Sequence, residues 1–407
     1  TTLFRSIKPH FFEPGLQNIL KKNILNKNFF AKHLSKKTSF TSNIIIIAVG
    51  TPSKNKKIDL SQIKNSIKFI AKYIKDKDTF FSIIIKSTVP PSTTDTYVKK
   101  IIEKYSNKKL SKNEFGLGMN PEFLREGSAI KDFINADRIV IGYEDNKTKE
   151  CIKKIYKKWK CEKIIVNSRT AEMIKYANNS LLAMQISGVN EIANICNSMG
   201  RININNVIKG VKSDKRWSPI INKKRIRPGI LNYLNPGPGF GGSCFPKDLE
   251  TFINLGKKLN ISSNLFNEVK KVNDLQPIKI INYIEKYLCN LNNKKILILG
   301  LSFKPDTDDI RESVSIKIIK NLILLKKNIQ IYAHDPVAIK NAKNLFKNNK
   351  KILFVKNWKK NISKTDIIMI LTSWPEYNDL KKTNYKLSKK IVIDRSNMFD
   401  IDNLLYN

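Results

Sequence analysis

Short apolar runs alternate with amphipathic patterns in both halves of the sequence, and this alternation constrains the fold more than any other feature. In the first half, apolar runs of strand length lie at residues 43–49, 81–86, 115–119, 138–142 and 163–166. Helical patterns separate them, for example at residues 60–74 and 95–105. Continuous apolar strands that alternate with helices are typical of a parallel sheet covered on both faces. The first half is therefore predicted to be a doubly wound α/β fold.

The middle of the chain is predicted to be helical, and the alternation resumes after it. The helical stretches cover about residues 170–199 and 262–289, and Pro277 is expected to kink the second or to mark a helix start. Strand patterns follow at residues 295–299, 329–333, 352–355, 367–371 and 390–394. The fold class predicted is α/β, with two Rossmann-like doubly wound parallel-sheet domains joined by a helical central domain. The predicted domains are residues 1–169, 170–290 and 291–407.

A dinucleotide-binding fingerprint is missing from the first half. Such a domain usually opens with a strand, the motif G-x-G-x-x-G and a helix, and the sequence contains no such motif. Its first legible strand already leads into Val49-Gly50-Thr51-Pro52. The first domain is therefore expected to be truncated at its start, and we expect the missing turn to weaken dinucleotide binding.

The composition argues against several classes of protein. No apolar run approaches the ~20 residues that span a bilayer, and no signal peptide is visible, so we expect a soluble, cytoplasmic chain without a membrane partner. Five cysteines without a C-x-x-C pair, and three histidines, give no support for a metal site or a disulfide scaffold. The formal charge of +41 comes from lysines spread along the chain together with many Ile and Asn residues, as A/T-rich codons produce. Without a basic arm or an aromatic platform, no nucleic-acid partner is expected.

The segment at residues 239–248, GFGGSCFPKD, carries the strongest chemical signal. Its glycines allow the backbone to approach a ligand closely. Cys244 lies near Lys247 at a predicted helix N-terminus, which is expected to lower the pKa of the thiol and make it nucleophilic. Asp248 returns to the same helix face and could hold a water molecule or act as a base. A structural glycine-rich turn with an inert cysteine is the alternative interpretation.

With this segment, the chain resembles the UDP-glucose and GDP-mannose dehydrogenase family, which performs two successive oxidations with NAD. The similarity begins at Phe12-Glu13-Pro14-Gly15-Leu16 and extends over almost the whole chain, with separate motifs in family order. The resemblance implies oxidation of the C6 alcohol of a nucleotide sugar to a carboxylate, with UDP-glucose as the favoured substrate, and a homodimer. A GDP-mannose or UDP-N-acetyl-hexosamine dehydrogenase and a catalytically silent nucleotide-sugar-binding remnant are the alternatives.

The resemblance implies roles for residues of the first half. Thr51 would contact NAD, Thr88 would order a catalytic water near the cofactor, and Glu126 would assist thioester hydrolysis, also near the cofactor. Three residues are expected to lie against the sugar nucleotide: Glu122, Phe123 and Leu124. By themselves, Glu122 and Glu126 would be interpreted as a solvated capping pair.

A helical pair is expected to stabilise the oxyanion and to contact the substrate. Lys175 and Asn179 are four residues apart, so both project from one face of the helix. An ammonium and an amide are suitable donors to developing alkoxide charge. Without the resemblance, they would be interpreted as an ordinary exposed helix face.

Further roles implied by the resemblance fall in the second half. Cys244 would form a thiohemiacetal and then a thioester, which water held by Asp248 would hydrolyse. Substrate contacts are expected at Tyr233, Gly241, Phe303, Lys304 and Arg216. Cofactor contacts are expected at Lys247 and Arg311.

Two departures from the family pattern leave assignments open. The segment before the cysteine is long, so the arginine that enters a neighbouring subunit is Arg216, Arg225 or Arg227. Near the C-terminus, Asp394-Arg395-Ser396-Asn397 has Ser396 where the family has arginine. Arg395 is not a certain substitute, because neighbouring residues on a strand point to opposite faces.

Overall fold

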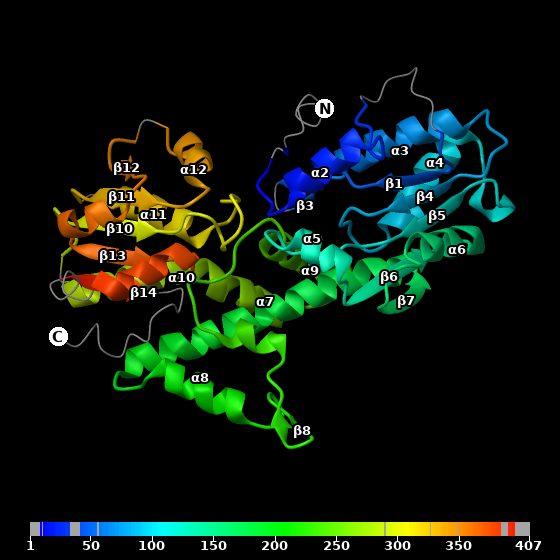
Figure 1. Ribbon diagram of the computed structural model, residues 1–407. Coiled ribbons are helices and arrows are strands. Elements are labelled where there is room, and N and C mark those ends of the chain that lie inside the picture. Colours follow the sequence, from blue (N-terminus) through cyan, green and yellow to red (C-terminus); the bar gives the residue numbers. More distant parts are fainter. Residues whose placement is uncertain are drawn as a thin grey trace. The chain divides into compact units, whose positions relative to one another are not determined.

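The computed structural model describes residues 9, 11–32, 41–54, 57–288, 290–325, 327–347, 349–383 and 390–394 (Figure 1). The chain divides into two compact units. The first comprises Thr1–Asn179 with Glu250–Ser262, and the second comprises Ser180–Leu249 with Ser263–Asn407. The predicted boundaries of three domains stay a prediction. Ser396 lies outside the described residues.

The sheet of the first unit has the strand order β1-β4-β5-β6-β7. Its strands lie where the apolar runs predict them: β1 (Ile44–Ile47), β4 (Ser82–Ile85), β5 (Gly116–Met119), β6 (Arg138–Tyr143) and β7 (Glu162–Asn167). The pairings are parallel, as predicted, except that β5 and β6 are antiparallel. The connection between them contains one short helix, α5 (Ala129–Ile134).

Helices cover both faces of this sheet. Residues Ile83 and Ile85 of β4 belong to one apolar core, whereas Ile84 belongs to another with Ile152 and Tyr156. Alternate residues of a strand point to opposite faces, so the two cores lie on opposite sides of the sheet. The covering helices are α3 (Ser61–Ile74), α4 (Lys99–Ser106) and α6 (Asn146–Ile155). A π-helix, η1 (Thr93–Val98), precedes α4 where the sequence predicts ordinary helix from residue 95.

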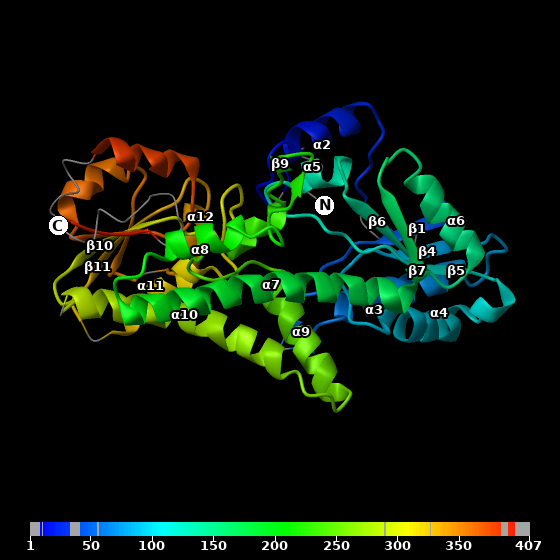
Figure 2. The ribbon, with the colours of Figure 1, turned by 90° about the horizontal axis from the view of Figure 1, so that it is seen from below.

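The remaining elements of the first unit are short, and the middle of the chain is mostly helical. In the first unit these are α2 (Leu16–Leu25), β2 (Ser53–Lys54), β3 (Lys57–Ile58) and η2 (Leu110–Lys112). Helices of the middle, labelled in Figure 2, are α7 (Ser168–Met199), α8 (Ile204–Ser213), α9 (Phe245–Lys258) and α10 (Asn264–Leu288). The 3₁₀-helix η3 (Gly229–Leu234) lies between α8 and α9 in the sequence. A small hairpin joins β8 (Ile220–Ile221) to β9 (Lys224–Arg225). Pro277 lies inside α10, so it does not mark a helix start.

The second unit contains a fully parallel sheet with the order β12-β11-β10-β13-β14. Its strands are β10 (Lys295–Leu299), β11 (Gln330–His334), β12 (Ile352–Phe354), β13 (Ile367–Ile370) and β14 (Ile391–Asp394). Between them lie α11 (Val314–Leu324), α12 (Ile339–Leu345), η4 (Lys359–Lys364) and η5 (Pro375–Thr383). Counted along the chain, this order is that of a Rossmann-like half, as predicted.

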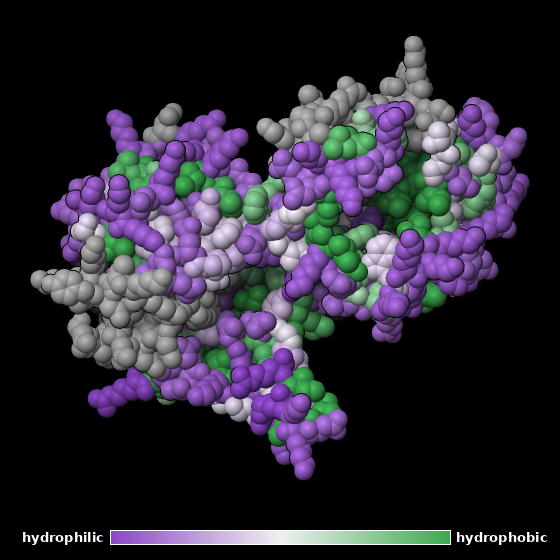
Figure 3. All heavy atoms as spheres, in the orientation of Figure 1, coloured by the Kyte–Doolittle hydropathy of each residue, from purple (hydrophilic) through white to green (hydrophobic). Residues whose placement is uncertain are grey.

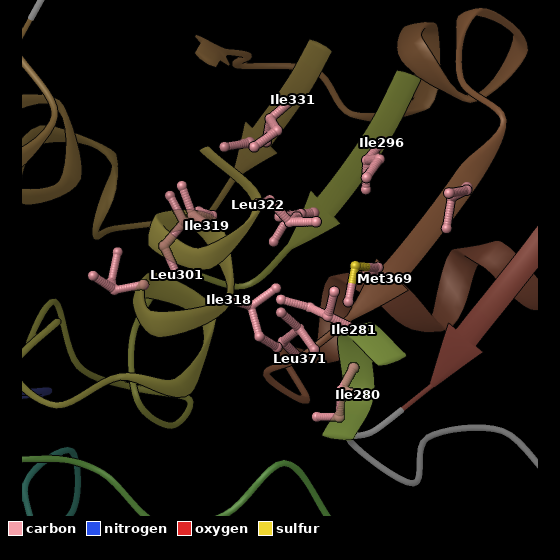
Figure 4. Packing of buried hydrophobic residues seen from close by; sticks show 14 of the residues in the cluster. Ile280, Ile281, Ile296, Leu301, Ile318, Ile319, Leu322, Ile331, Met369 and Leu371 are labelled. Carbon is pink, nitrogen blue, oxygen red and sulfur yellow. The ribbon is translucent and has the colours of Figure 1, made fainter. Parts of the chain in front are cut away.

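The core of the second unit also alternates along its central strand. Ile296 and Ile298 of β10 pack with α10 and α11, through residues such as Ile281 and Ile318 (Figure 4). Leu297 and Leu299 alternate with them along β10 and belong to a separate cluster with η4 and η5. No helix in the described part of the chain is long and apolar enough to cross a membrane.

Candidate active site

The carboxyl ends of β1 and β4 bring the two predicted cofactor threonines together. The Oγ1 atom of Thr51 donates a 2.8 Å hydrogen bond to the carbonyl of Thr88. Next to this pair, the Ser87 hydroxyl donates to the carbonyl of Val49 at 2.6 Å. Doubly wound sheets bind their ligands at the carboxyl ends of the strands. Thr51 and Thr88 therefore lie at the edge of the sheet where a dinucleotide is expected.

Lys175 and Glu122 form a partly buried ion pair in the first unit. The Lys175 side chain, on α7, donates to the Glu122 carbonyl at 2.7 Å and to its Oε1 atom at 3.2 Å. Its ammonium lies 5.3 Å from the ring centroid of Phe123. Lys175 is 4% exposed and Asn179 is 5% exposed, so the interpretation as an exposed helix face is wrong. The ammonium is held in place before any ligand arrives.

The carboxylate of Glu122 is shared between this lysine and its own loop. Its Oε2 atom accepts a 2.6 Å hydrogen bond from the backbone N–H of Leu124. The Arg138 guanidinium lies over the ring of the neighbouring residue Phe123, 4.0 Å from the ring centroid. The segment Glu122–Leu124 is thus fixed by two cations and one backbone bond.

Lys86 is a member of this cluster that the sequence analysis missed. Its ammonium donates to Asn120, at 2.9 Å to Oδ1 and 3.3 Å to the carbonyl. Tyr156 donates to the same Oδ1 atom at 2.6 Å. Burial is the main reason that the pKa of Lys86 falls to about 8; nearby Lys175 lowers it further, whereas Glu122 opposes the change. The signal available in the sequence was a lysine directly after a buried strand and two residues before Thr88.

A cavity of about 240 Å³ adjoins the cluster. Its lining includes Lys86, Glu122, Phe123, Leu124 and Tyr156. The cavity therefore lies beside the segment Glu122–Leu124, which is predicted to contact the sugar nucleotide, and charged and aromatic side chains line it.

Glu13 fixes the turn that contains Glu126. Its two carboxylate oxygens accept 2.7 Å hydrogen bonds from the backbone N–H groups of Gly127 and Ala129. Glu13 is buried, and Ala129 begins α5, whose N-terminal N–H groups need acceptors. The motif at residues 12–16 thus has a structural purpose that its sequence did not reveal.

In the second unit, the glycine-rich segment packs against the loop that carries Phe303. The Gly242 N–H donates to the carbonyl of Arg311 at 2.9 Å. At Gly242, where φ is +82°, an added Cβ would lie 2.7 Å from the Phe303 ring. A Cβ at Gly241 would clash with the carbonyl of Glu312. Both glycines are needed for this close backbone approach.

Asn273 of α10 holds the preceding residue of the same segment. Its Oδ1 atom accepts from the Phe240 N–H at 2.7 Å, and its Nδ2 group donates to the Phe240 carbonyl at 3.1 Å. Both Asn273 and Phe240 are buried. The segment is therefore clamped by side chains of α10 as well as by the loop after β10.

Cys244 is half-buried and directly precedes α9. Its carbonyl accepts from the Asp248 N–H at 2.8 Å, as the first turn of a helix requires. The ammonium of Lys247 lies 2.7 Å from Oδ1 of Asp248, which is buried. Ser243 Oγ is 3.6 Å from the Cys244 sulfur. The predicted lowering of the thiol pKa stays a prediction.

Two other predicted substrate residues of the second unit, and the predicted cofactor residue Arg311, have partners of their own. The Lys304 ammonium lies 5.5 Å from the Phe303 ring centroid. Tyr233 packs at a ring-centroid distance of 6.4 Å from Phe245. Arg311 forms an ion pair with Asp309 at 2.7 Å.

The structure also separates the three candidate arginines. Arg225 donates to the carbonyls of Ser213 and Ser218, at 2.7 and 3.1 Å, so it braces its own loop. Arg216 is exposed and pairs only locally with Asp214, at 2.7 Å. All three arginines are exposed, and Arg216 and Arg227 remain the candidates for the role in a neighbouring subunit.

Comparison with known proteins covers almost the whole chain. Models of the three domains of the UDP-glucose/GDP-mannose dehydrogenase family match: the NAD binding domain at residues 2–160, the central domain at 169–275 and the UDP binding domain at 297–401. The chain belongs to this dehydrogenase family. It is therefore a nucleotide-sugar dehydrogenase with NAD as its cofactor. Because the NAD binding domain is matched from residue 2, the predicted truncation is not confirmed.

Individual relatives agree with the family assignment. A UDP-glucose 6-dehydrogenase of Bacillus subtilis is 35% identical over 404 residues, which cover 98% of this chain and 86% of the relative. One from Rickettsia felis is 36% identical over 396 residues, covering 96% and 83%. The structure of a UDP-glucose dehydrogenase from the archaeon Pyrobaculum islandicum superposes with a TM-score of 0.83 at 31% identity, covering 97% of this dehydrogenase and 86% of that chain.

Proposed function

We propose that this chain oxidises UDP-glucose at C6 to the carboxylate in two successive steps, through intermediates covalently bound to Cys244. The observation that carries the proposal is the packing of the Gly241–Gly242 backbone against Phe303, because it joins the cysteine segment to the half that matches the UDP binding domain. The similarity to curated UDP-glucose 6-dehydrogenases supports the choice of substrate.

Residues of the first unit fit the cofactor and the first oxidation. Thr51 and Thr88 share a hydrogen bond at the carboxyl edge of a doubly wound sheet. Doubly wound sheets bind dinucleotides at this edge. NAD, when bound, accepts hydride from C6. The Lys175 ammonium, oriented by Glu122, stabilises the alkoxide oxygen as the C6 hydroxyl loses its proton to water. Asn179 supplies an amide from the same buried helix face.

Cys244 carries the second oxidation. Its thiolate adds to the aldehyde carbon, forming a C–S bond and a thiohemiacetal oxygen. The hydride that leaves this carbon would pass to a second NAD, and a thioester would remain. Water then attacks the thioester carbon, the C–S bond breaks, and the carboxylate and the free thiol are released. Asp248, Thr88 and Glu126 are the proposed partners of that water.

The experiment compares Cys244→Ala with Cys161→Ala, a half-buried free cysteine that has no proposed role. Cys244→Ala should lower uronic acid formation by at least about 10³-fold while UDP-glucose binds within about tenfold of the wild type. Cys161→Ala should retain activity. Acid production at the normal rate by Cys244→Ala would exclude the covalent mechanism, and mass spectrometry should find the trapped adduct on Cys244.

A substrate competition tests the second part of the proposal. UDP-glucose, UDP-N-acetylmannosamine and GDP-mannose are offered together, and kcat/KM is expected to be highest for UDP-glucose. Sites that hydrogen-bond a base edge or hydroxyl can discriminate by ~10⁴-fold. Preference for GDP-mannose would reverse the substrate assignment, whereas binding of UDP-glucose without NADH formation would identify a silent remnant.

We further propose a homodimer that uses the exposed face of the second half of α7. Leu181, Ile192, Ile195 and Met199 are exposed on this helix, and their spacing of 11, 14 and 18 residues from the first places them on one face. Gly188 lies on the same face, where an added Cβ would meet no described atom within 4 Å. Apolar residues also gather at the surface around β8 (Figure 3), where Ile220 and Ile221 are exposed. Such surfaces are typical of interfaces between subunits.

A further inference from the structure

Asp335, which directly follows β11, is a buried carboxylate with five hydrogen bonds from one loop and one turn. Its Oδ2 atom accepts from the N–H groups of Leu301 and Ser302, at 2.8 and 3.0 Å, and from the Ser302 hydroxyl at 3.0 Å. Its Oδ1 atom accepts from the N–H groups of Val337 and Ala338, at 2.9 and 2.8 Å. Asp335 is 1% exposed. Both oxygens are thus fully engaged by donors of the chain itself.

Further side chains close the surroundings of this carboxylate. The Trp374 indole N–H lies 3.2 Å from Asp335 Oδ2 and 3.1 Å from Ser302 Oγ. The Thr372 hydroxyl donates to the carbonyl of Ser302 at 2.7 Å, and Ser313 donates to that of Leu301 at 2.7 Å. Trp374, Thr372 and Ser313 are buried. The backbone of Leu301 and Ser302 is therefore held through its N–H groups and through its carbonyl oxygens.

The place of this carboxylate in the fold is informative. β10 is the central strand from which the order of the sheet reverses, and Leu301 and Ser302 follow it after Gly300. In a doubly wound half, N–H groups that follow this strand bind the phosphates of a ligand. Here the same N–H groups bind an aspartate of the neighbouring strand. The protein's own anion fills the position that a ligand phosphate takes elsewhere.

We propose that Asp335 is a positioning residue that replaces the ligand anion in this half and so holds Phe303 and Lys304 in place for the uridine nucleotide. The proposal rests on the proposed function, which assigns those two residues to the nucleotide. Phe303 is next to Ser302 in the chain, and its N–H donates to the carbonyl of Asp309 at 3.1 Å. Its ring packs on Gly242, so a shift of Ser302 would reach the glycine-rich segment as well.

The test uses the full chain with Asp335→Asn, measuring UDP binding by calorimetry and kcat and KM for UDP-glucose. The asparagine side chain has the size of aspartate, but one of its two acceptor oxygens is replaced by an NH₂ donor. Because both oxygens of Asp335 accept from backbone N–H groups, this donor would face N–H groups in either orientation of the amide. The variant should bind UDP at least about tenfold more weakly and raise KM similarly. kcat should change less than about threefold, and KM for NAD should be unchanged. A merely structural role would lower the active fraction and kcat without changing the UDP Kd.

A milder variant and a matched control accompany it. Ser302→Ala removes one donor to Asp335 and should weaken UDP binding about threefold, so it decides the question if Asp335→Asn fails to fold. Asp366→Asn is the control, because Asp366 also accepts from a backbone N–H of the same sheet, that of Lys295 at 2.8 Å, but at the opposite end of β10. It should bind UDP as the wild type does.

Two outcomes separate this inference from the proposed function. Unchanged UDP affinity in folded Asp335→Asn, or in Ser302→Ala, overturns the positioning role if Phe303→Ala and Lys304→Met do weaken UDP binding. If Phe303→Ala and Lys304→Met also leave UDP affinity unchanged, the nucleotide assignment of those two residues fails instead.

Discussion

Glu172 is a buried acid one helical turn before Lys175, and it connects to the segment that follows Thr88. Its Oε1 atom accepts from the Thr94 N–H, at the start of the π-helix η1, at 2.8 Å. Burial is the main reason that the pKa of Glu172 rises to about 7, and nearby Asp95 raises it further. The side chain is fully buried, so this acid affects the stability of the first unit rather than contacting solvent.

Glu172→Gln should change the dependence of stability on pH. Because the pKa of Glu172 is higher in the folded chain than the ordinary value of 4.5, the folded state binds more protons between about pH 4.5 and pH 7. The free energy of unfolding therefore falls as pH rises through that window, by about 3 kcal/mol for this group. Glu172→Gln should be more stable than the wild type at pH 8 and differ little near pH 4.5.

Urea unfolding at several pH values measures this effect. Glu191→Gln, at an exposed position of the same helix, is the control and should follow the wild type at every pH. A stability difference for Glu172→Gln that stays constant from pH 4.5 to pH 8 would contradict the prediction.

At the scale of elements, glycine is required in the loop before α9 but not in the helix α8. Gly242 has a φ of +82° and packs against the Phe303 ring. Gly210 lies within the helix α8, and an added Cβ there would meet no described atom within 4 Å. The first glycine is required by its backbone conformation and close approach, whereas the second only adds conformational freedom to the unfolded chain.

The two alanine substitutions should therefore change stability in opposite directions. Gly242→Ala should lower the free energy of unfolding by about 1–2 kcal/mol or more, because a left-handed conformation is costly for a residue with a Cβ. Gly210→Ala should raise it by about 0.5–1 kcal/mol, because glycine is a poor helix former. Parallel urea titrations measure both. Equal effects of the two substitutions would mean that the loop before α9 does not require glycine.

At the scale of the whole molecule, the apolar face of α7 is the feature that the single chain does not explain. Gly188 lies inside α7, where glycine costs about 1 kcal/mol relative to alanine, and it lies between exposed Leu181 and Ile192. A helix face of this kind, with a small residue among large apolar ones, allows another backbone to approach closely. The proposed homodimer supplies that second backbone.

Ile195→Asp should weaken self-association by at least about tenfold, because a charge at a buried interface loses its hydration without gaining a partner. Sedimentation over a range of concentrations measures the dissociation constant. Leu324→Asp, which changes an exposed apolar residue at the end of α11, is the control and should associate like the wild type. Equal association of all three proteins would place the interface elsewhere or exclude the dimer.

Much of the architecture follows from local sequence pattern. All ten principal strands lie within a few residues of their apolar runs, because a strand buried on both faces needs a continuous apolar stretch. The glycine-rich segment around Cys244 was also recognisable, since close backbone approach restricts the residue type directly. The direction of β6 was not recognisable, because burial on both faces of a sheet produces the same continuous apolar run in a parallel and in an antiparallel strand.

Long-range polar partners were decided only by the tertiary structure. Lys86 meets Asn120, Glu13 meets N–H groups at the start of α5, and Asp335 meets N–H groups after β10. The separations along the chain are 34, 114–116 and 33–34 residues. A charged residue in a sequence pattern looks the same whether it faces solvent or a buried N–H group. The chain by itself determined which segments form strands, helices and glycine turns. Which buried charge holds which loop depended on the packing of those segments, since packing alone removes water and leaves one set of donors within reach.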